Sequence, residues 1–228
     1  MKRSEINAVI REMETFIAAH GFHLPNFCRW TPEDWQHKGH EYDEIRDNML
    51  GWDITDYGLG DFSKVGFGLI TLRSGSQHDP RYPKVYAEKL LYLRPGMTAP
   101  LHFHRVKSED IINRGGGVLR ITLYNDDGSG GLSDSPVTVR ADGRCFTVSA
   151  GTQIRLEPGD SITLRPHQYH DFHVEAGSGP VLIGEVSQCN DDNTDNRFYE
   201  PIGRFPQIEE DEAPYRLLCN EYPPAAEG

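Results

Sequence analysis

Residues 96–116, GMTAPLHFHRVKSEDIINRGG, contain two histidines two positions apart and a glutamate shortly after them. On a β-strand, residues two apart point to the same face, so His102 and His104 would both face the interior of a β structure. Glu109 follows His104 by five positions, and on a continuous strand it would point the other way. A bend across residues 105–108 would bring its carboxylate back beside the imidazoles. Two imidazoles and a carboxylate suit a first-row divalent metal ion.

The spacing of this segment resembles the first motif of the cupin superfamily. That motif is a glycine, five residues, His-x-His, three or four residues, Glu, six residues and a glycine. The residues that meet its elements are Gly96, His102, His104, Glu109 and Gly116. The resemblance implies an all-β fold, a small antiparallel jelly-roll β-barrel that holds one divalent metal ion. It does not identify the reaction, because cupins include enzymes of several classes and binding proteins.

A second cupin motif lies near residue 170 and is looser. Pro166 and His170 are recognisable, but the usual Pro-x-Gly-x-x-His spacing is one residue short and its glycine is missing. His170, in a Tyr-His-Asp-Phe setting after the proline, matches the superfamily position and is expected to be the fourth metal ligand. His167 and His173 are the nearby alternatives, and we expect them to be structural or to face solvent.

The remainder of the chain agrees with an all-β fold. Between residues 51 and 186, short segments rich in β-forming residues alternate with clusters of Gly, Pro, Asn and Asp, which favour turns. The expected strands are residues 66–73, 85–93, 118–124, 137–140, 145–148, 153–156, 161–164 and 181–186. Many short strands without intervening helices are typical of a β-sandwich or barrel.

The ends of the chain have a different character. Apolar residues recur at helical spacing from Ile6 to Ile17, which predicts a helix capped by Ser4 and ended by Gly21. Residues 31–34, TPED, contain the cap, the proline and the early acidic residues of a second helix start.

We therefore expect a single domain over residues 1–228. It would consist of a helical packing segment at 1–50, the barrel at 51–186 and an irregular tail at 187–228 that wraps the barrel. A length of 228 residues is sufficient for one such domain with a proper core.

The net charge of −12 argues against binding to nucleic acid or to an anionic membrane surface, since both need clustered Lys and Arg. The first 21 residues are charged throughout and contain no long apolar run, so we expect no signal peptide or membrane span and a cytoplasmic protein. The four cysteines include no Cys-x-x-Cys pair and are expected to be reduced thiols. Because cupin barrels commonly pair through edge strands, a homodimer is expected.

Several blocks of sequence, one of them within residues 96–116, are similar to the D-lyxose isomerases, a bacterial cupin family that interconverts D-lyxose and D-xylulose using manganese. The blocks are GWDITDY at 51–57, YAEK at 86–89, HFHRVKSE at 102–109, and GEVS at 184–187 with NDD at 190–192 and DNRF at 195–198. The resemblance covers most of the chain. It implies an aldose–ketose isomerase that takes a small neutral sugar, D-lyxose, with D-mannose and D-fructose as a further pair. It also implies one divalent metal ion per chain, Mn²⁺, with Co²⁺, Fe²⁺ or Zn²⁺ as alternatives.

Aldose–ketose isomerisation moves a proton between adjacent carbons while a metal polarises the oxygens, so it needs a Lewis acid and a base near both carbons. Hydride transfer characteristically uses two metals, and this sequence offers one set of ligands. We therefore expect proton transfer through a cis-enediol.

Glu185 is the expected proton carrier, because it ends a strand whose other residues are apolar or small. The alternative is a rim carboxylate paired with Lys or Arg. Lys107 is expected to hydrogen-bond a substrate oxygen or to hold a catalytic carboxylate ionised, and its alternative is a turn lysine in solvent. Glu109 is a second acid–base candidate, although a bound metal would reduce its basicity.

Four residues are expected to bind the substrate. Lys89 lies in an otherwise apolar strand, and alternation would turn either it or Glu88 inward. Asp191, Asp192 and Arg197 follow the Glu185 strand and are expected to fold over the mouth of the barrel. The alternatives are an outward lysine in a salt bridge and a solvated acidic tail.

Three other functions share parts of this pattern. An iron-dependent cupin dioxygenase would use the same four ligands but prefers an apolar pocket. A non-catalytic sugar-binding cupin would usually carry a helix-turn-helix domain, for which too few residues follow Glu185. A phosphosugar isomerase would need clustered cations for the phosphate, and only Lys89, Arg197 and Arg204 are evident.

Overall fold

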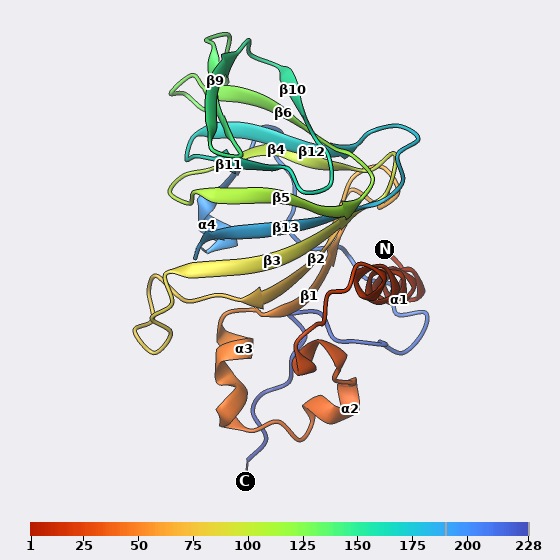
Figure 1. Ribbon diagram of the computed structural model, residues 1–228. Coiled ribbons are helices and arrows are strands. Elements are labelled where there is room, and N and C mark those ends of the chain that lie inside the picture. The colour runs from red at the N-terminus through yellow and green to blue at the C-terminus, as the bar shows by residue number, and fades with distance from the viewer. Residues whose placement is uncertain (190, 228) are drawn as a thin grey trace.

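A computed structural model describes residues 1–189 and 191–227, and for Asp192 and Asn193 it describes the backbone alone. Within this part of the chain, antiparallel strands form an eight-stranded sheet and a six-stranded sheet, and in Figure 1 the smaller sheet lies above most of the larger one, whose last strand, β9, reaches the top of the view. The order in the larger sheet is β1 (Gly51–Thr55), β2 (Phe67–Arg73), β3 (Tyr86–Leu93), β13 (Val181–Gln188), β5 (Glu109–Gly116), β11 (Ser161–Leu164), β8 (Val137–Ala141) and β9 (Arg144–Val148). The order in the smaller sheet is β10 (Thr152–Leu156), β6 (Leu119–Asp126), β12 (Gln168–Val174), β4 (Thr98–His104) and β14 (Asn196–Phe198), with β7 (Leu132–Ser133) beside β6.

The all-β prediction is confirmed, and each of the eight segments expected to be a strand overlaps one. β1, β5, β12 and the short strands β7 and β14 were not among the expected strands, and β4 was expected only through the two-residue spacing of its histidines. β14 and the short helix α4 (Asp192–Asp195) lie in the tail that was expected to be irregular. β14 pairs with β4 and so joins the tail to the strand that carries His102 and His104.

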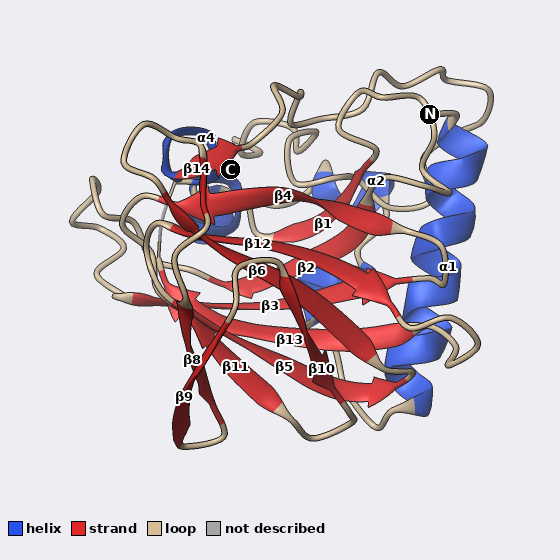
Figure 2. Cartoon of the chain, turned by 90° about the horizontal axis from the view of Figure 1, so that it is seen from above, coloured by secondary structure: helices blue, strands red, loops and turns tan. Residues whose placement is uncertain are grey.

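The first helix, α1 (Arg3–Ala19), covers the outside of the larger sheet at one end of its strands (Figure 2). Its apolar stripe is buried as the spacing predicted. The expected cap was wrong: the N-cap position is Lys2, and the Ser4 hydroxyl instead donates to Asp211 Oδ2 at 2.6 Å. Gly68 lets the helix approach the sheet, because a Cβ there would lie 2.2 Å from Met13 Sδ.

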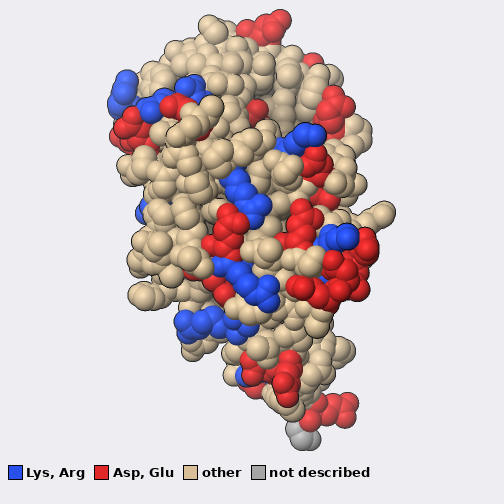
Figure 3. All heavy atoms as spheres, turned by 90° about the vertical axis from the view of Figure 1, so that its right-hand side faces the viewer, with Lys and Arg blue, Asp and Glu red and all other residues tan. Residues whose placement is uncertain are grey.

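Short helices follow α1 before the barrel begins. They are η1 (Asn26–Arg29), α2 (Pro32–Trp35), η2 (His40–Tyr42) and α3 (Asp43–Asp47). The predicted start of α2 is confirmed: Thr31 Oγ1 accepts from the Asp34 backbone N–H at 3.1 Å, and Asp34 Oδ2 accepts from the Thr31 N–H at 2.8 Å. None of the described helices is long and apolar enough to cross a membrane. Basic and acidic side chains alternate on the face shown in Figure 3.

The bend expected between His104 and Glu109 is present. β4 ends at His104, and β5 begins at Glu109 in the opposite sheet. The chain thus crosses from one wall of the barrel to the other within four residues, so the two imidazoles and the carboxylate face each other. The last motif glycine, Gly116, has φ +90°, and a Cβ there would lie 2.2 Å from the Pro180 carbonyl oxygen. Glycine is therefore needed where β5 turns towards β6.

Candidate metal centre and active site

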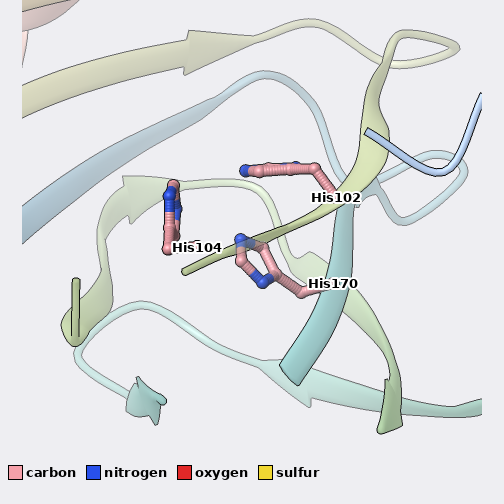
Figure 4. A group of neighbouring side chains, drawn as sticks. All are labelled: His102, His104 and His170. Carbon is pink, nitrogen blue, oxygen red and sulfur yellow. The ribbon is translucent and has the colours of Figure 1, made fainter. Parts of the chain in front are cut away.

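Three buried imidazoles converge inside the barrel (Figure 4). His102 and His104 come from β4, and His170 comes from the neighbouring strand β12, where it lies directly opposite His102 in the register. One ring nitrogen from each histidine lies within 4.8 Å of those of the other two. The structure therefore brings His170 to the pair from the first motif.

Backbone carbonyls orient two of these rings. His102 Nδ1 lies 2.8 Å from the Pro100 carbonyl oxygen, and His170 Nδ1 lies 3.0 Å from the Gln168 carbonyl oxygen. A carbonyl only accepts, so each Nδ1 carries the hydrogen and each Nε2 keeps its lone pair. This arrangement is typical of metal-binding histidines.

Glu109 completes the set of donors. Its Oε1 lies 3.3 Å from His104 Nε2 and 3.2 Å from His170 Nε2. Donors around one ion with bonds of about 2.1 Å are separated by roughly 3 to 3.4 Å, so these distances fit a shared cation. His170 Nε2 is also buried and makes no well-aligned hydrogen bond within the described chain. Three imidazole nitrogens and one carboxylate oxygen therefore fit a first-row divalent metal.

The protonation states suit a metal as well. Burial lowers the pKa of His102 well below its usual value, and the neighbouring imidazoles lower it further. Burial and then the Lys107 ammonium lower the pKa of His104. Burial by itself would raise the pKa of Glu109, but Lys107 and His104 outweigh it and hold this pKa well below the usual range. At neutral pH His102 and His104 are thus neutral and Glu109 is charged, the forms that bind metals.

A row of buried charges leads away from the metal donors. Lys107 Nζ lies 2.7 Å from Glu109 Oε2 and 2.8 Å from Glu185 Oε1. Glu185 Oε1 also accepts from the Ser187 hydroxyl at 2.9 Å and lies 3.5 Å from Lys89 Nζ. Negative and positive groups therefore alternate, and Lys107 is buried rather than facing solvent.

The expected substrate residues are placed unevenly. Lys89 points inward, and with Lys107 it lines the cavity beside the histidines. Asp191 lines a second, larger cavity. The side chain of Asp192 lies outside the described residues.

Arg197 is not brought to the site. It lies opposite Phe103 in the register of β14 and β4, whereas its neighbours Asn196 and Phe198 lie opposite the two histidines of β4. Alternation therefore turns the guanidinium to the outer face, where it lies against Gly130. Arg197 was expected to contact substrate inside the barrel, and this expectation was wrong because its side chain lies on the outer face.

Asp195 is a site residue that sequence reasoning missed. Its Oδ2 lies 3.6 Å from His104 Nδ1, its Oδ1 accepts from the Val106 N–H at 2.8 Å, and its carbonyl accepts from the Arg105 N–H at 3.0 Å. It thus holds the bend that returns Glu109 to the histidines. The only sequence signal was its place in the DNRF block.

Arg204 and Asp53 were also missed as site residues. They form a partly buried ion pair, and Arg204 lines the cavity beside the metal donors together with the aromatic rings of Tyr57, Phe172 and Phe198. Arg204 lies in a coil segment and Asp53 on β1, about 150 residues apart in the chain, so local patterns could not pair them.

His167 and His173 lie away from the donors. His167 Nδ1 lies 3.1 Å from Asp126 Oδ2, and His173 Nδ1 lies 3.5 Å from Asp171 Oδ1. His167 also has φ +61°, a conformation that glycine adopts more readily. His167 therefore forms the turn into β12 in a left-handed backbone conformation, within the motif that lacks the usual glycine.

Comparison with known proteins agrees with this geometry. The family model described as D-lyxose isomerase matches residues 1–222. The chain belongs to the D-lyxose isomerase family. It is 48% identical to the D-lyxose/D-mannose isomerase of Serratia proteamaculans and 46% identical to that of Escherichia coli O157:H7, over 97% of this chain and 98% of each relative. It is therefore a sugar isomerase.

Solved structures of L-ribose isomerases share the fold of this family member. The enzyme of Acinetobacter sp. DL28 in complex with L-ribose has a TM-score of 0.61 at 13% identity. The enzyme of Cellulomonas parahominis with L-psicose has a TM-score of 0.56 at 17% identity. Each comparison covers 92% of this chain and 98% of the other. The cupin-like barrel is thereby confirmed.

The ligand set makes a direct prediction. His170→Ala should lose tight binding of Mn²⁺, because it removes one of four donors, whereas His167→Ala should retain it. Isothermal titration calorimetry on the metal-free variants measures the Mn²⁺ affinity of each. Circular dichroism shows whether each variant is folded. Normal binding by His170→Ala together with loss in His167→Ala would reassign the fourth ligand.

Proposed function

We propose that this family member interconverts D-lyxose and D-xylulose, and D-mannose and D-fructose, in the cytoplasm with one Mn²⁺ per chain. The observation that carries the proposal is the buried row from Glu109 through Lys107 to Glu185, which begins at three converging imidazoles. The names of the two relatives at 46–48% identity support the choice of sugars.

The donors for the metal are His102, His104, His170 and Glu109. When bound there, the ion would supply Lewis acidity that polarises the carbonyl and hydroxyl oxygens of the sugar. Lys107 and Lys89 reach the same cavity as hydrogen-bond donors. They orient the sugar oxygens, and the aromatic lining limits access of water.

Glu185 moves the proton in this proposal. It takes the proton from C2 of the aldose and returns it to C1, so a cis-enediol lies between aldose and ketose. Its Oε1 is held by Lys107 and Ser187, which sets the position of the carboxylate near the reacting carbons. Glu109, whose Oε2 faces Lys107, is the second acid–base group: it takes the proton of the C2 hydroxyl and gives a proton to the C1 oxygen, so that no proton is gained or lost overall.

The charges favour an unphosphorylated sugar. Lys107 and Lys89 are matched by Glu109 and Glu185, and Arg204 is matched by Asp53. A phosphate needs cationic groups beyond those already paired. The paired charges that stand among the aromatic residues of this cavity are not expected in the apolar pocket of a cupin dioxygenase.

The homodimer belongs to the same proposal. Tyr86 and Val186 lie on neighbouring strands β3 and β13 and are 49% and 43% exposed, and Val85 next to them is 76% exposed. Exposed apolar side chains favour contact with another protein surface. Because β3 and β13 are interior strands of the larger sheet, this contact would use the face of the sheet and not an edge strand.

The sugars and the metal are tested together. A panel of unphosphorylated aldoses and ketoses with added Mn²⁺ should give turnover of D-lyxose, with D-mannose as a slower substrate, read as product by chromatography. EDTA should abolish turnover without unfolding the barrel, because an extensive apolar core supports the ligands. Conversion of phosphorylated sugars alone, or full activity without metal, would refute the proposal.

Glu185→Gln tests the proton carrier. Glutamine keeps the size and hydrogen-bonding capacity of the side chain but lacks a basic oxygen, so turnover should fall about 10²-fold or more. Metal content and sugar affinity should change little, and both are measured on the same preparation. Near-normal turnover would move the base elsewhere, and loss of the metal would make Glu185 a support of the metal site.

A further inference from the structure

A cavity of about 300 Å³ adjoins the metal site. The cavity beside the metal donors is smaller, about 40 Å³ on the same measure. The two cavities share Lys89 and Arg204 in their linings, so the larger one, which we call the outer chamber, lies next to the metal site.

The register of the larger sheet leads into the outer chamber. Glu185 on β13 lies opposite Lys89 on β3, and Lys89 lies opposite Thr71 on β2. Directly paired residues point to the same face, so these three form one polar row on the inner face of the sheet. Thr71 lines the outer chamber. Neighbouring strands are about 4.8 Å apart, which places Thr71 roughly 10 Å from Glu185.

An open-chain hexose matches this length. Extended chains advance about 1.2 Å per bond, so five carbon–carbon bonds span about 6 Å. The terminal C–O bond and a hydrogen bond of about 2.8 Å extend the reach to roughly 10 Å. A hexose with its reacting carbons beside Glu185 therefore brings its last hydroxyl to Thr71, whereas a pentose ends one carbon earlier.

Asp53 supplies a hydrogen-bond acceptor at this end. Its side chain is 2% exposed and lines the outer chamber. Oδ2 pairs with Arg204, but Oδ1 is buried without a hydrogen-bond partner among the residues that the structure describes. A buried carboxylate oxygen without a donor is costly, and a sugar hydroxyl is a donor that would satisfy it.

We propose that the outer chamber is the subsite for the sixth carbon of an aldohexose, with Asp53 accepting a hydrogen bond from the terminal hydroxyl and Thr71 beside it. The proposal rests on the proposed function and adds the determinant of chain length. D-Lyxose and D-mannose have the same configuration from C2 to C4 and differ by one carbon. A variant that changes only the reaction of D-mannose therefore acts at the sixth carbon, and one that changes both acts at the reacting carbons.

Thr71→Val and Asp53→Asn test the subsite. Both should lower kcat/KM for D-mannose about tenfold or more, mainly through KM, because a hydrogen bond to the remote hydroxyl is lost. D-Lyxose should stay close to wild type in Thr71→Val, which leaves the pair of Asp53 and Arg204 in place. 6-Deoxy-D-mannose, which lacks the hydroxyl, should be insensitive to Thr71→Val. Thr147→Val, on the exposed face of β9, is the matched control and should change neither sugar.

Calorimetric affinities of D-mannitol and D-arabinitol, the polyols related to the two sugars, give a readout that does not require turnover. Thr71→Val should weaken binding of D-mannitol alone. Equal losses for both polyols, or none, would overturn the subsite even if the sugars are converted. Failure of the wild-type protein to convert either sugar would count against the proposed function, and the polyol affinities would still decide the subsite.

Discussion

The site depends on one buried ammonium group. Lys107 Nζ lies between Glu109 and Glu185, 2.7 and 2.8 Å from their oxygens, and so joins the metal donors to the expected base. Removing one partner from a buried ion pair typically costs roughly 3–5 kcal/mol, because the remaining charge is left uncompensated. Two carboxylates this close would repel each other without the lysine. Lys107 therefore makes it possible to have a charged ligand and a charged base in the same small space.

The barrel supplies the geometry that this arrangement requires. The chain leaves β4 at His104, turns within four residues and enters β5 at Glu109, so both walls of the barrel contribute donors. Asp195 fixes the turn by accepting from two of its backbone N–H groups. Because Asp195 is the last residue of α4, directly before β14, the tail helps to position the candidate metal donors and does not only cover the barrel.

Short-range spacing in the sequence was sufficient for the centre of the site. The pair His102 and His104 follows from the two-residue period of a strand. Glu109 would face away on a continuous strand, so its place beside the histidines required the bend across residues 105–108, which the structure contains. Alternation along the strand required either Lys89 or Glu88 to point inward, and the structure shows that it is Lys89. These inferences concern residues close in the chain, where backbone geometry restricts the outcome.

The remaining contacts depend on tertiary packing. Arg197 could not be oriented from sequence, because its strand has three residues and its face is set by pairing with β4. The pair of Arg204 and Asp53 joins a coil segment to β1, and no local pattern indicates such a contact. Ser4 has the chemistry of a helix cap but donates to Asp211 in the tail instead, so a tertiary contact replaced a local preference.

The most direct test of the account is the fate of the migrating hydrogen. When D-lyxose is converted in heavy water, proton transfer by Glu185 through a cis-enediol predicts deuterium at C1 of the D-xylulose, because the carboxylic acid formed on Glu185 can exchange with solvent. Mass spectrometry and NMR of the product measure the incorporation at several enzyme concentrations and reaction times. Complete retention of the substrate hydrogen in every case would indicate hydride transfer and contradict the account.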